Sequence, residues 1–348
     1  MSAAAAGPSA PGSAPRFLIV RLGSLGDIVH AIPAAAAVRA AFPDARIDWL
    51  VDPRYVSLVQ MVTAVSHVVP LDPRAGVIRL LATLGELRRR KYTVAIDLQG
   101  LLKSAVLARL SGADRVLGFS PAHLRERMAR YFYSDAPDTP GRHVVQKNLA
   151  LVAALGIDTG LPEFPLDVPR TPAVETVERQ FGGAPFALIN PGAAWPNKRW
   201  PPDRLAAVAS ALAERHALRS IVLWGPAERE LAEAVVAAAG GAALLSPPTT
   251  IADLVALARG AAIMVSGDTG PTHIAAAVGT PLVGIYGPTR PERNGPWRPA
   301  DITVSRADSC ECHHLRRCRR ETMCLMDIGM AEVLDAVERR LAAEQTRA

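Results

Sequence analysis

The chain has 348 residues, of which 49% are hydrophobic and 21% charged, and this balance excludes a disordered protein or a collagen-like fibre. At about 150 residues per domain, the length predicts two domains. The formal charge of +6 indicates an anionic partner. Aromatic residues make up only 5%, which is few for a protein that stacks on bases, so we predict no nucleic-acid partner.

The N-terminal segment and the absence of long apolar runs predict the compartment. No uninterrupted apolar run approaches the roughly 18 residues of a membrane-spanning helix. Residues 1–15 are rich in Ala, Pro, Ser and Gly and lack the basic start and apolar stretch of a signal peptide, so we predict a disordered tail. We therefore expect a cytoplasmic protein whose cysteines stay reduced.

Short apolar runs alternate with helical patterns along the chain. In the first half we expect strands at 17–20, 47–51 and 93–97 and helices at 27–41, 80–90 and 101–110. In the second half we expect strands at 186–190, 220–224, 262–265 and 281–286 and helices at 203–216, 228–239, 272–278 and 330–344. This βαβ rhythm predicts parallel sheets covered by helices on both faces.

Repeated prolines between 160 and 172 mark a linker between the two series. We therefore predict an α/β protein with two Rossmann-like, doubly wound domains, at 16–170 and 171–329. The last helix, within 330–348, is expected to pack back toward the first domain. Because open parallel sheets bind ligands at the carboxyl ends of their strands, we expect the two domains to face a cleft that holds two substrates.

The first candidate site is the segment Arg21–Asp27, which follows the first strand and opens a helix. Its glycines allow a tight turn and a close approach to a ligand. Asp27 lies beside free backbone N–H groups that favour the carboxylate, and a carboxylate accepts a proton from a hydroxyl. The alternative is that Asp27 only caps the helix.

Two further loops carry groups suited to a phosphate. Gly267–His273 again joins a strand to a helix, whose N-terminus, with Thr269 and His273, suits an anion. The loop 190–201 presents Lys198 and Arg199, whose charge suits a diphosphate leaving group. The alternatives are a capped helix with a packed histidine, and a solvated pair of charges on a loop.

Taken in order along the chain, these segments resemble one family, the ADP-heptose:lipopolysaccharide heptosyltransferases. The resemblance covers about residues 16–345. It is carried by the segments Gly23–His30, Asp97–Ser104, Lys198–Pro201, Gly267–His273 and Tyr286–Thr289. Segment 99–104 is most similar to the enzymes that add the first heptose.

The resemblance implies a two-domain glycosyltransferase of the GT-B type, with inverting, metal-independent transfer from an ADP-heptose donor. Its acceptor would be the Kdo/heptose inner core on lipid A, and it would need no cofactor; the alternative is a relative that uses another nucleotide sugar or glycan acceptor. By motif match, Asp27 takes the place of the catalytic base and Lys198 that of the lysine facing the diphosphate. The implied donor-binding residues are Gly192, Lys198, Glu228, Asp268, Thr269, Gly270 and His273, and the implied acceptor-binding residues are Ser24, Gly26, Gln99 and Lys103. Ala193 and Ala194 depart from the pattern, since many relatives carry Ser or Thr there.

All four cysteines lie between 310 and 324, and a similar cluster occurs in some related members. The spacing of Cys310, Cys312, Cys318 and Cys324 does not match the paired CxxC of common zinc sites. We favour a loop of reduced thiols with no metal; a structural zinc or iron–sulfur site is the alternative.

Basic residues at 88–91, 125, 127 and 130, with Lys103, suit an acidic acceptor or an anionic membrane. At helical spacing, Leu124, Met128, Tyr131 and Phe132 share one face, which is more typical of core than of a membrane anchor. We expect peripheral association with the cytoplasmic face of the inner membrane that weakens at high salt.

Overall fold

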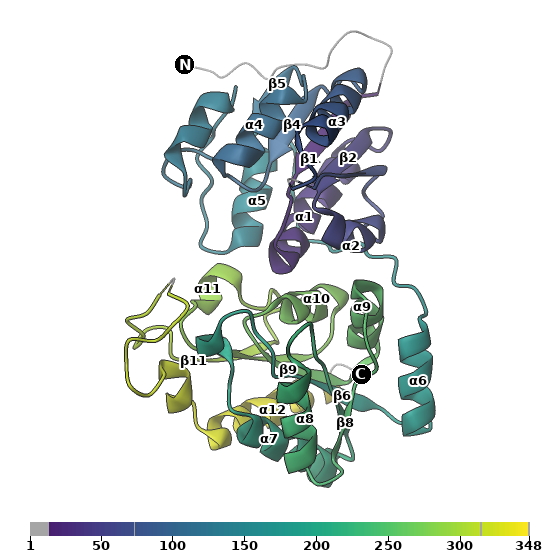
Figure 1. Cartoon of the computed structure of the whole chain (residues 1–348), viewed down its shortest axis with the longest axis vertical. Helices are drawn as coiled ribbons and strands as arrows, with labels where there is room; N and C mark the ends of the chain where they lie inside the picture. The colour runs from purple at the N-terminus through teal and green to yellow at the C-terminus, as the bar shows by residue number, and fades with distance from the viewer. Residues whose placement is uncertain (1–13, 73, 314, 347–348) are drawn as a thin grey trace. The chain divides into compact units, whose positions relative to one another are not determined.

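The computed structural model describes residues 14–72, 74–313 and 315–346, so most of the predicted tail at 1–15 lies outside the described residues. The chain forms two compact units that divide between Asp167 and Val168 (Figure 1). Among the described residues, no helix has the length and apolar character needed to cross a bilayer.

Unit 1 is built on a five-stranded parallel sheet of strand order β3-β2-β1-β4-β5. The strands are β1 (Arg16–Val20), β2 (Arg46–Val51), β3 (His67–Pro70), β4 (Val94–Asp97) and β5 (Arg115–Leu117). Strand β1 lies at the centre because its apolar run is buried from Phe17 onward. The strand order reverses between β1 and β4: from β1 the chain first adds β2 and β3 toward one edge of the sheet, and then β4 and β5 toward the other.

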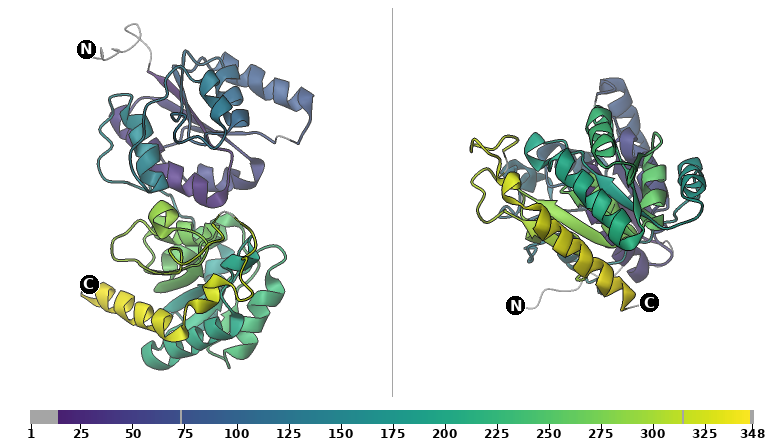
Figure 2. Two further views of the ribbon diagram at one scale, coloured as in Figure 1. Left: turned by 90° about the vertical axis from the view of Figure 1, so that its left-hand side faces the viewer. Right: turned by 90° about the horizontal axis from the view of Figure 1, so that it is seen from below.

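The helices of unit 1 flank this sheet (Figure 2). They are α1 (Leu25–Ala41), α2 (Val56–Gln60), α3 (Val77–Arg89), α4 (Leu102–Leu110) and α5 (Val144–Ala153), with 3₁₀ turns at Pro53–Tyr55 and Arg127–Phe132. Helix α1 packs closely against α5, and α3 against α4. The start of α1 follows directly from the central strand, so its first turn lies at the carboxyl edge of the sheet.

Unit 2 repeats this plan with a six-stranded parallel sheet of order β11-β10-β9-β6-β7-β8. The strands are β6 (Phe186–Asn190), β7 (Arg219–Val222), β8 (Ala243–Leu245), β9 (Ile263–Gly267), β10 (Leu282–Tyr286) and β11 (Ile302–Ser305). The helices are α6 (Pro172–Phe181), α7 (Pro202–His216), α8 (Arg229–Ala238), α9 (Ile251–Gly260), α10 (Gly270–Val278), α11 (Pro291–Asn294) and α12 (Met330–Gln345), with 3₁₀ turns at Pro196–Lys198 and Cys324–Asp327. The reversal of strand order falls between β6 and β9.

The last helix, α12, is part of unit 2. Its apolar face, from Val333 to Leu341, joins the core that α7, α8 and the sheet share. A buried ion pair also ties it to the sheet, since Arg340 Nε donates to Asp301 Oδ1 at 2.9 Å and both side chains are fully buried. These contacts place the apolar stripe of α12 in the core of unit 2, whereas the expected packing of this helix toward the first domain stays a prediction.

The expected strands and helices are present, with ends that shift by up to three residues. The sequence interpretation missed the short strands β3, β5, β8 and β11 and the helices α2, α5, α6, α9 and α11. It also treated 124–132 as one helical face. In the structure Leu124 is buried while Met128 and Tyr131 are exposed, because this stretch contains a 3₁₀ turn rather than an α-helix.

Candidate active site

Each unit gathers its polar residues at the point where its strand order reverses. In unit 1 the loop after β1 carries Arg21 to Asp27, and the loop after β4 carries Gln99. In unit 2 the loop after β6 carries Lys198, and the loop after β9 carries Asp268. This position, at the carboxyl ends of the central strands, is where open α/β sheets bind their ligands.

Asp27 lies in the first turn of α1 and is held from two sides. Arg21 Nη2 lies 2.7 Å from its Oδ1, while the backbone N–H and hydroxyl of Ser24 donate to its Oδ2 at 3.1 and 2.9 Å. The bond from the Ser24 backbone closes a capping box, so Asp27 does contribute to helix capping. The ion pair with Arg21 goes beyond capping and fixes the direction of the carboxylate.

These contacts set the charge of Asp27. Burial raises the pKa of this carboxyl group, but the Arg21 charge and the hydrogen bonds from Ser24 outweigh burial and lower the pKa below its ordinary value. Asp27 is therefore ionised at neutral pH. Arg21 is itself buried, and its Nη1 donates to the Leu98 carbonyl at 2.5 Å, so it cannot swing away from the carboxylate without losing that bond.

The segment Asp97–Ser104, which follows β4, contacts the loop that precedes Asp27. Gln99 Oε1 accepts a hydrogen bond from the Leu22 backbone N–H at 2.9 Å, which links the loop after β4 to the loop after β1. Asp97 is fully buried and accepts hydrogen bonds from the Tyr133 hydroxyl at 2.7 Å and the Ser104 hydroxyl at 2.9 Å. Asp97 therefore fixes the loop after β4, and Gln99 in turn holds the loop after β1.

The other residues implied for the acceptor differ in exposure. Gly26 is buried in the first turn of α1. Ser24 is exposed, but its hydroxyl is bonded to Asp27. Lys103 is exposed on the first turn of α4 and carries the charge of this group.

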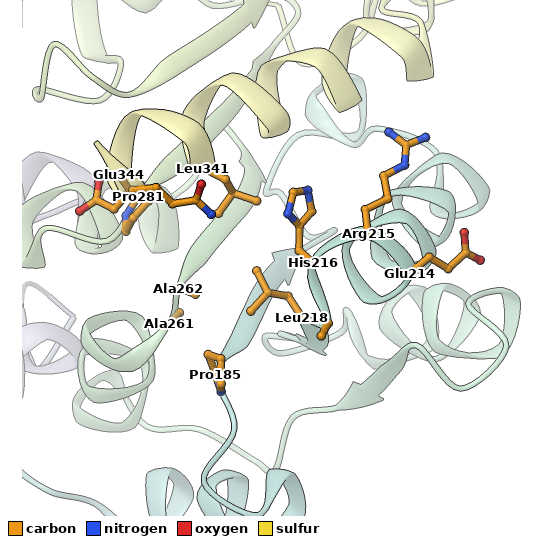
Figure 3. A pocket seen from close by; sticks show the side chains of 12 residues that line it. Pro185, Glu214, Arg215, His216, Leu218, Ala261, Ala262, Pro281, Leu341 and Glu344 are labelled. Atoms are coloured by element: carbon orange, nitrogen blue, oxygen red, sulfur yellow. The ribbon is translucent and has the colours of Figure 1, made fainter. Parts of the chain in front are cut away.

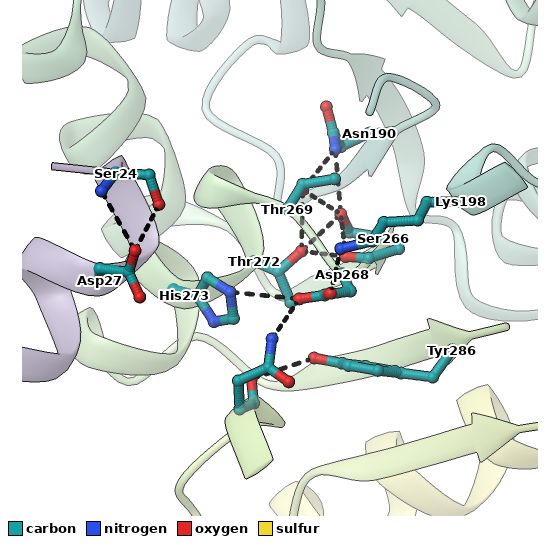
Figure 4. A network of polar contacts seen from close by, with 12 residues as sticks. Ser24, Asp27, Asn190, Lys198, Ser266, Asp268, Thr269, Thr272, His273 and Tyr286 are labelled. Carbon is teal, nitrogen blue, oxygen red and sulfur yellow. Dashed lines mark hydrogen bonds and ion pairs between the residues drawn. The ribbon is translucent and has the colours of Figure 1, made fainter. Parts of the chain in front are cut away.

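In unit 2 the buried carboxylate of Asp268 is the centre of a polar network (Figure 4). Lys198 Nζ donates to its Oδ2 at 2.5 Å, Asn294 Nδ2 donates to its Oδ1 at 2.7 Å, and His273 Nε2 lies 3.4 Å from Oδ1. Burial raises the pKa of Asp268, but His273 and Lys198 outweigh burial, so the pKa lies well below its ordinary value. Lys198 is thus paired with an ionised carboxylate.

The helix start beside Asp268 is held by neutral side chains. Asn190 Nδ2 donates to the hydroxyls of Thr269 and Ser266 at 3.0 and 3.1 Å. Thr269 is the N-cap of α10, and Gly270 opens the helix. Because the first N–H groups of a helix have no partner within it, this end favours an anion.

Gly267 explains how the Lys198 loop approaches the sheet. A Cβ at this position would lie 2.9 Å from the Lys198 carbonyl oxygen, so only glycine leaves room for that backbone. Lys198 Nζ also lies over the Trp195 ring, 4.7 Å from its centroid. The lysine is therefore fixed by its backbone, by a carboxylate and by an aromatic face.

Glu228 lies against the loop after β6, at the start of α8. Its carboxylate accepts from the Gly225 backbone N–H at 3.2 Å and lies 4.0 Å from the Arg199 guanidinium. A Cβ on Gly192 would lie within 3 Å of three atoms of this carboxylate. Glu228 and Gly192 are therefore neighbours, as expected of residues that share one ligand.

The structure brings together the predicted residues within each unit and adds partners that sequence reasoning missed. In unit 1 this added partner is Arg21, which pairs with Asp27 and lies at the start of the segment Arg21–Asp27. In unit 2 the missing partners are Asn190 and Asn294. No sequence signal places Asn294 beside Asp268, because it comes from the short helix α11.

One pocket lies away from these residues (Figure 3). It is lined by residues that precede the strands of unit 2, including Pro185, Ala262 and Pro281, and by the end of α12. It is therefore at the amino ends of the strands, opposite the edge that carries Lys198 and Asp268.

Comparison with known proteins identifies the family. Residues 80–323 match the family described as glycosyltransferase family 9 (heptosyltransferase). The sequence is also 30% identical to the lipopolysaccharide heptosyltransferase 1 of Pseudomonas aeruginosa, over 95% of this chain and 99% of the relative. The chain belongs to glycosyltransferase family 9. It is therefore an enzyme of the glycosyltransferase class.

Solved structures of glycosyltransferase family 9 show the same fold. The Veillonella parvula member aligns with a TM-score of 0.83 at 21% identity, covering 97% of this chain and 100% of that one. The E. coli heptosyltransferase WaaC, solved with ADP, aligns with a TM-score of 0.71 at 24% identity, covering 96% and 99%. The predicted pair of doubly wound α/β domains is confirmed.

Proposed function

We propose that this glycosyltransferase moves a heptose from ADP-heptose to the Kdo/heptose inner core of lipopolysaccharide, with inversion at C1. Support comes from the family, from the full-length likeness to a lipopolysaccharide heptosyltransferase 1, and from an E. coli relative solved with ADP-2-deoxy-2-fluoro heptose. The observation that carries the proposal is a pair of half-sites. The half-site of unit 1 is the Asp27 carboxylate held by Arg21, and the half-site of unit 2 is Lys198, paired with Asp268 beside the start of α10.

The donor diphosphate binds to unit 2. Lys198 and the first N–H groups of α10 supply its positive field, and His273 adds a donor beside them. Asp268 cancels part of this charge and holds the lysine in one direction. The site therefore favours a ligand whose negative charge grows during the reaction, which is what a departing diphosphate provides.

Asp27 removes the proton from the acceptor hydroxyl. The hydroxyl oxygen forms the bond to C1, the C1–O bond to the diphosphate breaks, ADP leaves with that electron pair, and the proton passes to Asp27. Because Arg21 lowers the pKa of Asp27, the carboxylate is a weak base. The proton consequently moves late, after the forming bond to C1 has made the hydroxyl strongly acidic.

The acceptor binds to unit 1 through Lys103 and through the loop that Gln99 braces. The acceptor is proposed to carry acidic groups, and Lys103 is an exposed cation on the first turn of α4. Ser24 and Gly26 shape the floor of this half-site and keep Asp27 in place.

Unit 1 is also proposed to bind the anionic inner membrane on its cytoplasmic side. Helix α3 exposes Val77, Ile78 and Leu81 to 69%, 86% and 61%. Exposed Arg88 and Arg89 follow on the same helix, whereas Arg90 is occupied by Asp48 and Glu86. Exposed apolar side chains with nearby arginines suit a shallow insertion into anionic lipid.

Vesicle sedimentation tests the membrane proposal. Vesicles with an anionic lipid should retain the wild type, and binding should weaken as salt rises. The double change I78S/L81S should abolish retention, while V174S on the α6 surface of unit 2 should not. Retention of I78S/L81S equal to wild type would remove α3 as the contact.

A donor panel tests the transfer itself. ADP-heptose, ADP-glucose, a UDP-sugar and a GDP-sugar are each offered with Kdo-lipid A, and product is followed by mass spectrometry. Transfer from ADP-heptose alone is expected. Transfer from another nucleotide sugar would replace the donor, and ADP-heptose binding without transfer would point to an acceptor further out in the core.

A further inference from the structure

The four cysteines of the chain form one cluster in the loop between β11 and α12. Cys310, Cys312 and Cys324 are buried, and their sulfur atoms lie within 4.8 Å of one another. The Sγ of Cys310 is 2.9 Å from that of Cys312 and 3.2 Å from that of Cys324. Cys318, half-buried, packs against these three, and none of the four is in a disulfide.

This loop contains little regular secondary structure. Between Ser305 and Met330 the only regular element among the described residues is the 3₁₀ turn Cys324–Asp327. Residues 315–317 and 319–322 are exposed, and the thiols form an apolar cluster of their own, separate from the sheet core. A loop longer than about 15 residues normally needs a ligand or function to order it.

We propose that Cys310, Cys312, Cys318 and Cys324 bind one thiophilic divalent metal, zinc or ferrous iron, as a tetrathiolate site. With metal–sulfur bonds of about 2.3 Å, a tetrahedron places its sulfur atoms about 3.8 Å apart. The two sulfur separations given above, 2.9 and 3.2 Å, are shorter than this value, and all three buried sulfur atoms lie within 4.8 Å of one another, so small outward shifts of the side chains make room for the metal. This proposal replaces the interpretation of the cluster as a loop of reduced thiols.

The charges around the cluster match such a site. Four thiolates and one divalent cation leave a net charge of about −2. Arg316, Arg317, Arg319 and Arg320 flank Cys318 in the sequence, and of these Arg320 pairs with Asp327. Cysteine binds a metal as the thiolate, and a bound divalent cation supplies the positive charge that stabilises four neighbouring thiolates.

The cluster is connected to the donor half-site through Asn197. This side chain is buried and donates from Nδ2 to the Leu315 carbonyl at 3.0 Å, with Cys312 Sγ at 4.0 Å. Asn197 immediately precedes Lys198 in the 3₁₀ turn Pro196–Lys198. A metal that orders residues 310–324 therefore acts as a positioning element for Lys198.

Other contacts reinforce this link. His313 Nδ1 is hydrogen-bonded to the Pro288 carbonyl at 2.9 Å, and Trp200 Nε1 donates to the Ile328 carbonyl at 3.1 Å. Arg204 Nη1 donates to the carbonyls of Met326 and Ile328 at 2.9 and 2.7 Å. The loop between β11 and α12 is thus attached to the Lys198 turn through Asn197 and to the residues after that turn through Trp200 and Arg204.

Metal content of the full chain, purified without chelator under argon, tests the site. Mass spectrometry of zinc and iron should give about one metal per chain. C312S should lose it, and the matched control E321Q, an exposed acid in the same loop, should keep it. Cobalt(II) added to the metal-free protein should give the intense thiolate charge-transfer band of a tetrahedral site. Metal-free protein with four titratable thiols, or equal metal in C312S and wild type, would overturn the site.

The link to Lys198 is tested by ADP titration calorimetry, and this part rests on the proposed donor site. Removing the metal, or introducing C312S, should weaken ADP binding about tenfold. N197A should weaken ADP binding while leaving the metal in place, which a purely structural role for the cluster would not do. Unchanged affinity in N197A would overturn the coupling. Failure of the wild type to bind ADP would instead overturn the proposed function and leave the metal count standing.

Discussion

The two half-sites occupy equivalent positions in the two sheets but are built differently. In unit 1 a single carboxylate, Asp27, is held by one arginine and one serine and remains partly open. In unit 2 the buried carboxylate of Asp268 is surrounded by a lysine, a histidine and an asparagine. The same fold position therefore carries a partly open carboxylate in one unit and a buried carboxylate enclosed by charged and polar side chains in the other.

This difference fits two chemical tasks. A group that accepts a proton must reach the reacting hydroxyl and change its charge, so it needs an open face. A site that stabilises a leaving group works best when its charges are fixed in advance, because they then need no rearrangement during the reaction. The arrangement around Asp27 suits the first task and that around Asp268 the second.

The largest expected effect comes from removing Asp27, the proposed base. D27N should lower kcat by about 1,000-fold, because the neutral amide cannot accept the proton. ADP affinity should change little, since ADP is assigned to unit 2. The matched control is D52N, which breaks the exposed pair with Arg54 in the next loop of unit 1. Turnover of D27N near the wild-type rate would remove Asp27 from the mechanism.

The second test removes the buried ion pair that anchors α12 in unit 2. R340A leaves the buried Asp301 carboxyl group without its cation and should lower the free energy of unfolding by about 3 kcal/mol. R339A, which removes an exposed pair with Asp335 on the same helix, should change it by less than about 0.5 kcal/mol. Urea unfolding followed by circular dichroism measures both. Equal stability of R340A and R339A would mean that α12 is not anchored by this pair.

The third test removes the cationic and imidazole side chains around Asp268. K198A should weaken ADP binding by about 30-fold, since a charge-assisted contact contributes about 2 kcal/mol. H273A should act mainly on donor affinity, with a smaller effect. Calorimetry with ADP measures both, and R229A, on the outer surface of α8, serves as the control. Wild-type affinity in both K198A and H273A would contradict the assigned diphosphate site.

The smallest effect concerns pH. Because Arg21 lowers the pKa of Asp27, kcat/KM should hold down to a pH below the ordinary aspartate range and fall only as Asp27 is protonated. R21M removes the positive charge, so the pKa of Asp27 rises and the acid limb should move to higher pH. The profile of R54M, which lacks a different exposed pair, should not move. An unshifted acid limb in R21M would show that Asp27 does not control it.

The fold was largely predictable because its central strands are long, apolar and buried on both faces. Strands β1, β6 and β10 were found from their composition alone. The edge strands β5 and β8 have three residues each and were missed, because so short a run has no detectable period. The amphipathic pattern of α12 predicted a helix, but such an apolar stripe does not specify which core it enters.

The site residues that come shortly after a strand in the sequence could be predicted, because their position relative to the sheet edge follows from the strand itself. Asp27 and Asp268 stand at fixed places after β1 and β9, so spacing and family resemblance both led to them. Asn294 belongs to a short helix whose position depends on the tertiary fold. The pairing of Lys198 with Asp268 joins loops 70 residues apart and equally required the structure. The four cysteines were noticed, but their spacing resembles no common metal pattern.

The place of α12 in the core of unit 2 has a consequence for synthesis on the ribosome. Unit 1 ends at Asp167, so all its strands are available to fold while the second half is still being translated. Unit 2 lacks Val333, Val337 and Arg340 until α12 emerges. The second unit therefore stays incomplete until that helix has been synthesised, and during that interval its sheet exposes the apolar face that α12 later covers.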